Sequence, residues 1–133
     1  MKRLFADTFY YLALLNTSDS AHQRARDFTA AFSGRMITTA WVITELADAM
    51  AGIGDREAFK AFLDAQRMDP DVHIVPFDDL LFDEAIELYA SRSDKEWSLT
   101  DCTSFLVMER EDLTEALTAD RHFEQAGYRA LLM

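Results

Sequence analysis

Cysteine, glycine and proline are all scarce in this chain of 133 residues. The single cysteine, Cys102, excludes a disulfide within the chain, so stability has to come from an apolar core. With only 4 glycines, 2 prolines and a hydrophobic fraction of 50%, the composition is that of a globular protein and not of a disordered one. The sequence therefore predicts one domain over residues 1–133, with no linker and no internal repeat.

Long apolar runs are missing as well. No run approaches the roughly 18 to 20 residues of a membrane-spanning helix. The apolar stretch that follows Lys2 and Arg3 has only about five residues, too few for the hydrophobic region of a secretory signal peptide. We therefore expect a soluble, cytoplasmic protein that does not bind a membrane.

Positive charge is the third shortage. Lysine and arginine number 13 against 24 aspartates and glutamates, so the formal net charge at pH 7 is -11. Proteins that hold the phosphate backbone over a broad surface use lysine and arginine, and this balance argues against such a surface. If the protein handles nucleic acid, a bound divalent cation or a basic partner protein has to supply positive charge locally.

What the chain does have is a regular alternation of strand and helix signals. Short apolar runs predict strands at residues 2–6, 36–39, 72–75, 116–118 and 128–132. Amphipathic or apolar stretches predict helices at residues 8–15, 18–32, 40–51, 55–68, 78–91, 99–110 and 120–126. We expect Ser18 and Asp19 to cap the second helix and Gly34 to end it. The alternation is typical of an α/β fold in which helices cover both faces of a five-stranded parallel sheet.

Two carboxylates follow predicted strands directly. Asp7 comes at the end of the first strand, and Asp120 follows the fourth strand after Thr118 and Ala119. In a parallel sheet with right-handed crossovers, the carboxyl ends of all strands lie at one edge, and α/β proteins bind their ligands there. We therefore expect these two side chains at the same edge.

Two further acids lie on helices that reach this edge. Asp101 is in the first turn of the helix before the fourth strand, and that helix must run antiparallel to the strand. Glu45 is in the second turn of the helix after the second strand, close enough for a long side chain to reach back. Both acids lie beside the apolar face of their helix. The sequence thus predicts four acids at one edge.

Such a cluster calls for a cation. Two carboxylates about 5 Å apart repel each other by roughly 3 kcal/mol at an effective dielectric constant near 20. Carboxylate oxygens are hard ligands that suit Mg²⁺ or Mn²⁺, and such a centre can activate water for hydrolysis of a phosphodiester without a nucleophilic side chain. The predicted metal ligands and catalytic residues are Asp7, Glu45, Asp101 and Asp120.

Each of these acids also has a purely structural interpretation. Asp7 could cap the helix that begins at Thr8, and Asp120 could cap the short helix that follows it. Asp101 stands three residues after Ser98 in the pattern of a capping box, and Glu45 could simply be solvated. Taken singly, each acid favours the structural interpretation, because caps are commoner than metal ligands. The convergence of all four favours the metal site.

Five stretches spread over almost the whole chain carry a further signal. They are residues 5–8 (FADT), 44–46 (TEL), 97–105 (WSLTDCTSF), 118–123 (TADRHF) and 126–128 (AGY). In this order they resemble the PIN-domain family and, within it, the VapC-type ribonuclease toxins of bacterial and archaeal toxin-antitoxin pairs. The resemblance implies a three-layer α/β/α sandwich, Mg²⁺- or Mn²⁺-dependent cleavage of RNA, inhibition by a cognate VapB-type antitoxin, and a homodimer. It assigns the four family acids to Asp7, Glu45, Asp101 and Asp120.

Neighbouring residues are given lesser roles. Thr118 and Ser98 are candidates for hydrogen bonds to the carboxylates or to water. Arg121, His122 and Lys95 lie where a phosphate would pass. The chain's 3 histidines are scattered without ligand spacing, which argues against a zinc site. Packing roles are expected for Trp41, Trp97 and Cys102.

An alternative from another class is a catalytically silent domain whose acidic edge binds a basic segment of a partner protein. Mn²⁺ would not stabilise such a domain, whereas chelation would stop a nuclease. Two other acidic α/β classes fit poorly. A phosphoacceptor receiver needs paired acids after the first strand and a lysine after the last, and an aspartyl phosphatase needs a second aspartate where Phe9 stands.

Overall fold

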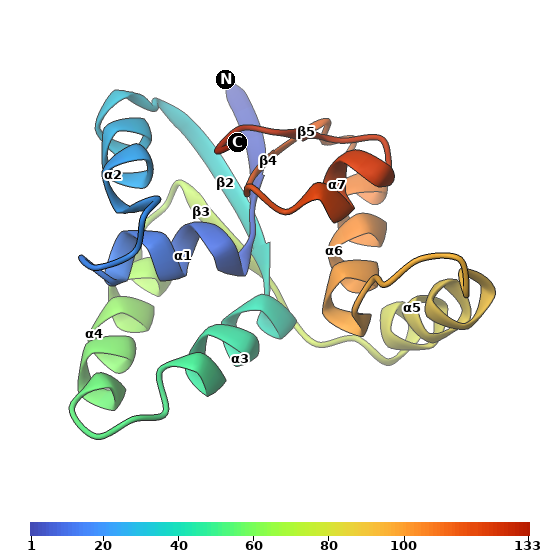
Figure 1. The fold of residues 1–133 in the computed structure, drawn as a ribbon, viewed down its shortest axis with the longest axis horizontal. Helices are drawn as coiled ribbons and strands as arrows, with labels where there is room; N and C mark the ends of the chain where they lie inside the picture. The colour runs from blue at the N-terminus through green and yellow to red at the C-terminus, as the bar shows by residue number, and fades with distance from the viewer.

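A five-stranded parallel sheet forms the centre of the computed structural model, which describes residues 1–133 (Figure 1). Its strands, in the spatial order β3-β2-β1-β4-β5, are β1 (Lys2–Ala6), β2 (Gly34–Thr39), β3 (Val72–Val75), β4 (Glu115–Leu117) and β5 (Arg129–Ala130). The seven helices are α1 (Thr8–Leu15), α2 (His22–Ala31), α3 (Ala40–Ala49), α4 (Asp55–Met68), α5 (Asp79–Ser91), α6 (Leu99–Arg110) and α7 (Arg121–Gln125). The predicted α/β class and the all-parallel sheet are confirmed.

The helices form two outer layers because the chain crosses the sheet in two directions. From β1 the chain steps through β2 to β3, and it then returns past β1 to β4 and β5. Right-handed crossovers place the helices of these two halves on opposite faces. Accordingly α1, α2 and α4 lie on one side of the sheet in Figure 1, and α5, α6 and α7 on the other. The result is the expected three-layer sandwich.

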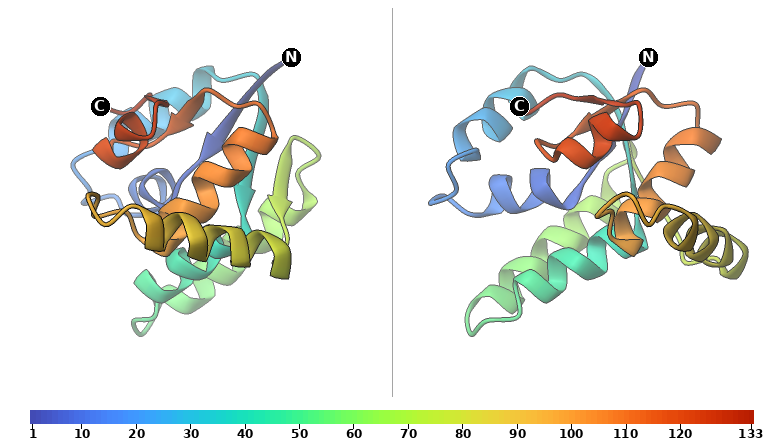
Figure 2. Two further views of the ribbon diagram at one scale, coloured as in Figure 1. Left: turned by 90° about the vertical axis from the view of Figure 1, so that its right-hand side faces the viewer. Right: turned by 45° about the vertical axis from the view of Figure 1, so that its right-hand side comes forward.

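The central strand β1 is the most deeply buried part of the sheet. Leu4, Phe5 and Ala6 are fully buried, as expected for a strand that has neighbours on both sides and helices on both faces. Around it, 23 buried apolar residues form one continuous core. Figure 2 shows α3 and α4 projecting together from the body of the protein, while α5 lies at its edge against α6. No helix combines the length and the hydropathy that crossing a membrane would require.

Several predicted boundaries are wrong. The second helix begins at His22, because the Asp19 carboxylate accepts a hydrogen bond from the backbone N–H of Ala21 and stays outside the helix. Gly34 does not end that helix, which stops at Ala31, but is the first residue of β2. The last strand contains only Arg129–Ala130, because β4, its sole neighbour in the sheet, is itself only three residues long. The other helices and strands agree with the prediction to within two residues.

Gly34 is a glycine because the backbone of β1 passes very close to it. Gly34 is paired with Lys2, and a Cβ atom at residue 34 would lie 2.3 Å from the Lys2 carbonyl oxygen. The Gly34→Ala substitution should therefore push the two strands apart and lower the free energy of unfolding by about 1 to 3 kcal/mol. Urea denaturation measures this loss. Gly52→Ala is the matched control, because the nearest atom to its Cβ would be 3.5 Å away; equal midpoints for both variants would contradict the prediction.

Candidate active site

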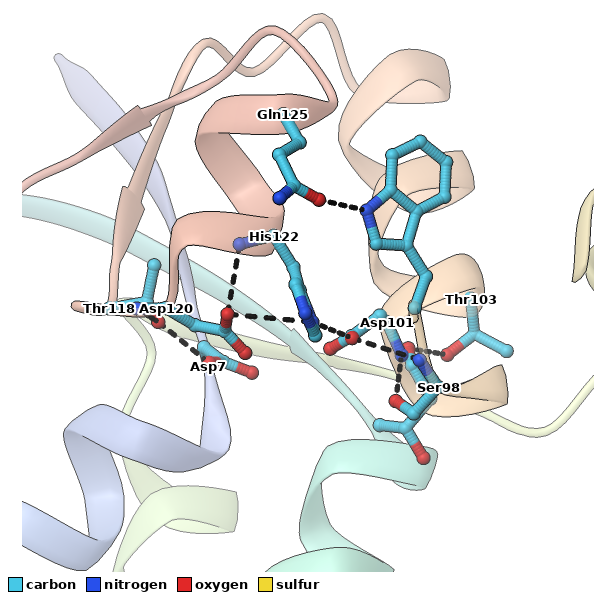
Figure 3. A network of polar contacts seen from close by, with 10 residues as sticks. Asp7, Ser98, Asp101, Thr103, Thr118, Asp120, His122 and Gln125 are labelled. Carbon is cyan, nitrogen blue, oxygen red and sulfur yellow. Dashed lines mark hydrogen bonds and ion pairs between the residues drawn. The ribbon is translucent and has the colours of Figure 1, made fainter. Parts of the chain in front are cut away.

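The candidate site lies at the carboxyl ends of β1 and β4. These strands are neighbours in the sheet, and the direction in which the chain crosses the sheet reverses between them. Such a reversal leaves a crevice, and open α/β sheets bind ligands there. Asp7 directly follows β1, Asp120 is the N-cap residue of α7 just after β4, and Asp101 is in the first turn of α6. Figure 3 shows the three carboxylates facing a common space below the ring of His122.

Asp7 is buried and does not act as a helix cap. It occupies the N-cap position of α1, but its side chain makes no capping hydrogen bond. Instead the Thr118 hydroxyl donates to Asp7 Oδ2 at 2.9 Å, and Thr118 Oγ1 accepts from the backbone N–H of Asp120 at 3.0 Å. The hydroxyl of Thr118 thereby ties the first acid to the segment that carries the last one, which is the role predicted for this residue.

Asp101 and Asp120 both cap helices, and each does so with one oxygen. Asp101 Oδ2 accepts from the backbone N–H of Ser98, and Ser98 Oγ accepts from that of Asp101, so the predicted capping box is present. Asp120 Oδ1 accepts from the backbone N–H of His122 at 2.9 Å. The second oxygen of each carboxylate is engaged in no hydrogen bond. Capping and metal binding are therefore compatible in these two residues.

The ring of His122 lies between two of the acids. Its Nδ1 is 2.9 Å from Asp101 Oδ2 and 3.5 Å from Asp120 Oδ1. One polar atom from each of these three residues lies within 4.8 Å of the others. The sequence analysis gave His122 only a place near a passing phosphate and missed this contact. The signal available in the sequence was its position two residues after Asp120, the N-cap residue whose carboxylate it contacts.

Glu45 acts on this group through its charge. It is on α3 and partly buried, and its negative charge contributes to raising the pKa of Asp7. That contribution is smaller than the one from Asp101. The structure thus brings Asp7, Asp101 and Asp120 together, and Glu45 acts on Asp7 through its negative charge.

The electrostatics of the site show an excess of negative charge. Burial raises the pKa of Asp7 from 3.8 to about 7, and the charges of Asp101 and Glu45 push the pKa in the same direction. The hydrogen bond from Thr118 and the adjacent backbone N–H of Thr8 lower the pKa but do not offset burial. The metal-free site therefore accommodates a charged Asp7 only at a substantial cost in free energy.

No lysine or arginine relieves this charge. The ion pairs made by these residue types all lie elsewhere, and they are Lys2–Glu115, Arg3–Glu111, Lys60–Asp64, Arg92–Asp94, Arg110–Glu84 and Arg129–Glu115. In addition, the Thr8 hydroxyl next to Asp7 is buried without a hydrogen-bond partner. A buried hydroxyl of this kind is suited to bind a water molecule. Carboxylate oxygens, a spare hydroxyl and unbalanced charge together fit a hydrated Mg²⁺ or Mn²⁺ ion.

Comparison with known proteins identifies the fold and its relatives. The family model described as the PIN domain matches residues 4–127. The chain belongs to the PIN domain family. The predicted resemblance to this family, and within it to the VapC-type toxins, is confirmed by the relatives described next.

This PIN domain is similar over nearly its whole length to a mycobacterial protein. It is 29% identical over 126 residues to the 23S rRNA-specific endonuclease VapC20 from two strains of Mycobacterium tuberculosis, covering 94% of this chain and 95% of the relative. The crystal structure of M. tuberculosis VapC20, described as a sarcin-ricin loop cleaving toxin, superimposes with a TM-score of 0.85 at 26% identity, with the same coverage. FitAcB from Neisseria gonorrhoeae, at 17% identity, a TM-score of 0.66 and coverage of 96% and 94%, shares the fold.

The two tryptophans and the single cysteine of this PIN domain serve packing. Trp97 is buried, lies edge-on to Phe105 at 5.0 Å, and donates its indole N–H to the side-chain oxygen of Gln125. Trp41 is partly buried and packs edge-on against Phe77. Cys102 is fully buried in the core. The packing roles predicted for these three residues are confirmed.

Proposed function

We propose that this PIN domain is a metal-dependent endoribonuclease toxin of the VapC type. The observation that supports it most directly is the group formed by Asp7, Asp101 and Asp120, whose carboxylates face one space with no lysine or arginine paired to them. The endonuclease VapC20 is similar across almost the whole chain, which supports RNA as the substrate class.

The residues that would hold the ion are the four predicted acids. Asp7, Asp101 and Asp120 offer carboxylate oxygens at the sheet edge (Figure 3), and Glu45 on α3 would add a fourth carboxylate. A bound Mg²⁺ or Mn²⁺ ion supplies a Lewis acid that polarises a phosphodiester and acidifies a water molecule. Thr118 fixes the orientation of the Asp7 carboxylate through its hydrogen bond. Burial of Asp7 keeps bulk water from competing for this side of the site.

The substrate we propose is a structured ribosomal RNA and not RNA in general. The net charge of -11 opposes tight binding of a phosphate backbone by charge alone, so recognition has to depend on RNA shape and on the bound cation. VapC20 is specific for 23S rRNA, which makes a stem-loop of the large ribosomal RNA the first substrate to test. Indiscriminate degradation of a mixed RNA pool at physiological salt would contradict this preference.

Two protein partners complete the proposal. A cognate VapB-type antitoxin with a basic segment would complement the acidic site, because the site itself contains no lysine or arginine pair. A homodimer is supported by an apolar stripe on α5, where Phe82, Ile86 and Tyr89 stand at helical spacing and are 41%, 37% and 53% exposed. We place the toxin and its antitoxin in the cytoplasm, where ribosomal RNA is found.

Metal removal tests the proposed function. The purified protein should cleave a ribosomal stem-loop RNA in the presence of Mn²⁺, lose at least about 100-fold in rate with excess EDTA, and recover when Mn²⁺ is added back. Denaturing gel electrophoresis of labelled RNA measures the rates. Cleavage that survives chelation would contradict the proposal. A protein that neither cleaves RNA nor is stabilised by Mn²⁺ would instead match a silent domain that binds a basic partner segment.

A further inference from the structure

The His122 side chain contacts the carboxylates of two of the acids at once. Asp101 belongs to α6 and Asp120 caps α7, and Asp120 stands 19 positions after Asp101 in the chain. Because carboxylate oxygens only accept hydrogen bonds, the Nδ1 that lies 2.9 Å from Asp101 and 3.5 Å from Asp120 is the donor. A single imidazole N–H therefore bridges two like charges that would otherwise repel each other (Figure 3).

We propose that His122 is a positioning residue that holds Asp101 and Asp120 at the separation needed to bind one cation together with Asp7. The inference rests on the proposed metal-dependent function and adds a residue to it. The imidazole engages Oδ2 of Asp101 and Oδ1 of Asp120, the same two oxygens that cap the helices. The remaining oxygen of each carboxylate is left for the ion. Groups that hold metal ligands in place in this way are worth about 10- to 100-fold in metal affinity.

Other contacts join the segments that contain α6 and α7 without contacting a carboxylate of the site. The Trp97 indole donates to Gln125 Oε1 at 3.0 Å, and the Tyr128 hydroxyl donates to the Phe105 carbonyl at 3.1 Å. Phe105 and Phe123 also pack edge-on with ring centres 5.0 Å apart. Loss of His122 should therefore leave α7 docked while it releases the two acids. This separates a positioning role from a general role in stability.

Three substitutions at residue 122 distinguish the bridging atom from the rest of the ring. Asn places an amide N–H as many bonds from the backbone as Nδ1, whereas Gln places one at the position of Nε2. His122→Ala and His122→Gln should weaken Mn²⁺ binding by about 10- to 100-fold, and His122→Asn should stay within about threefold of the wild type. Isothermal titration of Mn²⁺ into the RNA-free protein measures the affinity. Gln125→Ala, which breaks the nearby contact with Trp97 alone, should bind Mn²⁺ like the wild type.

A second readout separates positioning from direct contact with RNA. If His122 acts through the metal ligands, the cleavage rate of His122→Ala should approach that of the wild type when the Mn²⁺ concentration is raised well above the weakened Kd. A group that contacts the reacting atoms would leave a deficit at saturating Mn²⁺. The melting temperatures of the metal-free variants check that all of them are folded.

The outcomes are distinct. Weak binding by the Ala and Gln variants, with recovery in the Asn variant, supports the inference. Equal Mn²⁺ affinity in all variants overturns it while leaving the proposed nuclease intact, and so does equal weakening by His122→Ala and Gln125→Ala, which would indicate loss of helix docking. If the wild type itself binds no Mn²⁺, the proposed metal-dependent function fails first and the inference falls with it.

Discussion

Replacing Asp7 with asparagine is expected to change activity and stability in opposite directions. The rate of RNA cleavage should fall at least about 100-fold, because a carboxylate that holds the ion contributes more than the residues that merely orient it. The free energy of unfolding of the metal-free protein at pH 8 should rise by up to about 4 kcal/mol. This figure follows from the difference between the Asp7 pKa of about 7 and its ordinary value of 3.8. Asparagine keeps an acceptor for Thr118 and carries no charge into the buried site.

The pH dependence of the free energy of unfolding also tests the raised pKa of Asp7, and the direction of its change can be predicted. A carboxyl group whose pKa is raised by folding contributes its stability fully below the unfolded-state pKa near 3.8 and loses it as the pH rises through about 7. The metal-free wild type should therefore lose stability between about pH 4 and pH 7, at up to about 1.4 kcal/mol per pH unit. Asp7→Asn should show a flatter curve over this window. Urea denaturation in EDTA at a series of pH values measures both.

Asp48→Asn is the matched control for this comparison. Asp48 is exposed on α3 and its loss changes the net charge by the same amount. This variant should keep the activity and the pH profile of the wild type. Parallel pH profiles for the wild type and Asp7→Asn would mean that Asp7 is ionised in the folded protein at little cost. That result would remove the electrostatic reason for a cation at the site.

The sequence predicts best those parts of the fold whose signals are local. The helices at Thr8–Leu15, Asp55–Met68 and Leu99–Arg110 begin and end where expected. Each start has a nearby cause: Asp7 ends a buried apolar strand, Gly54 adopts a left-handed backbone before Asp55, and Ser98 forms a capping box. Such signals act over three or four residues, so a reading of the sequence alone can find them.

Boundaries that depend on pairing between strands cannot be predicted from such local signals. Gly34 has the composition signal of a helix end, yet the approach of the Lys2 carbonyl makes it the start of β2. The apolar run that ends in Leu131 and Leu132 predicts a strand of five residues, and only Arg129–Ala130 pair. In both cases a segment far away in the sequence decides the outcome.

The residues of the candidate site also differ in how far the sequence predicts them. Topology alone brings Asp7 and Asp120 together, because they follow neighbouring strands on either side of the point where the sheet reverses its order. Helix direction adds Asp101. The side-chain conformations of Glu45 and His122 decide how these two take part, and no periodicity encodes them. The two interpretations, helix cap and metal ligand, do not exclude each other, because Asp101 and Asp120 each use one carboxylate oxygen for the cap and have a second one free.

The second large effect is expected for Mn²⁺ itself. An ion that binds only the folded protein stabilises it by roughly 3 kcal/mol when present at about 100 times its Kd. At pH 8 Asp7 is mostly ionised in the metal-free protein, so binding displaces few protons there. At pH 5 one proton has to leave a carboxyl group of pKa about 7, which weakens the apparent affinity by about 100-fold. The same Mn²⁺ concentration should then stabilise the protein by less than about 1 kcal/mol.

Thermal or urea unfolding with and without Mn²⁺ at pH 5 and pH 8 measures this difference, and Asp7→Asn should respond weakly to Mn²⁺ at both. The comparison distinguishes the site from the many exposed acids of a protein with a net charge of -11. Exposed carboxylates have ordinary pKa values near 4 and are ionised at both pH values, so Mn²⁺ held at the surface would stabilise the protein about equally at pH 5 and pH 8. An equal response would therefore place the ion outside the site formed by Asp7, Asp101 and Asp120. A response confined to high pH requires an acid with a raised pKa, and burial raises the pKa of Asp7 to about 7.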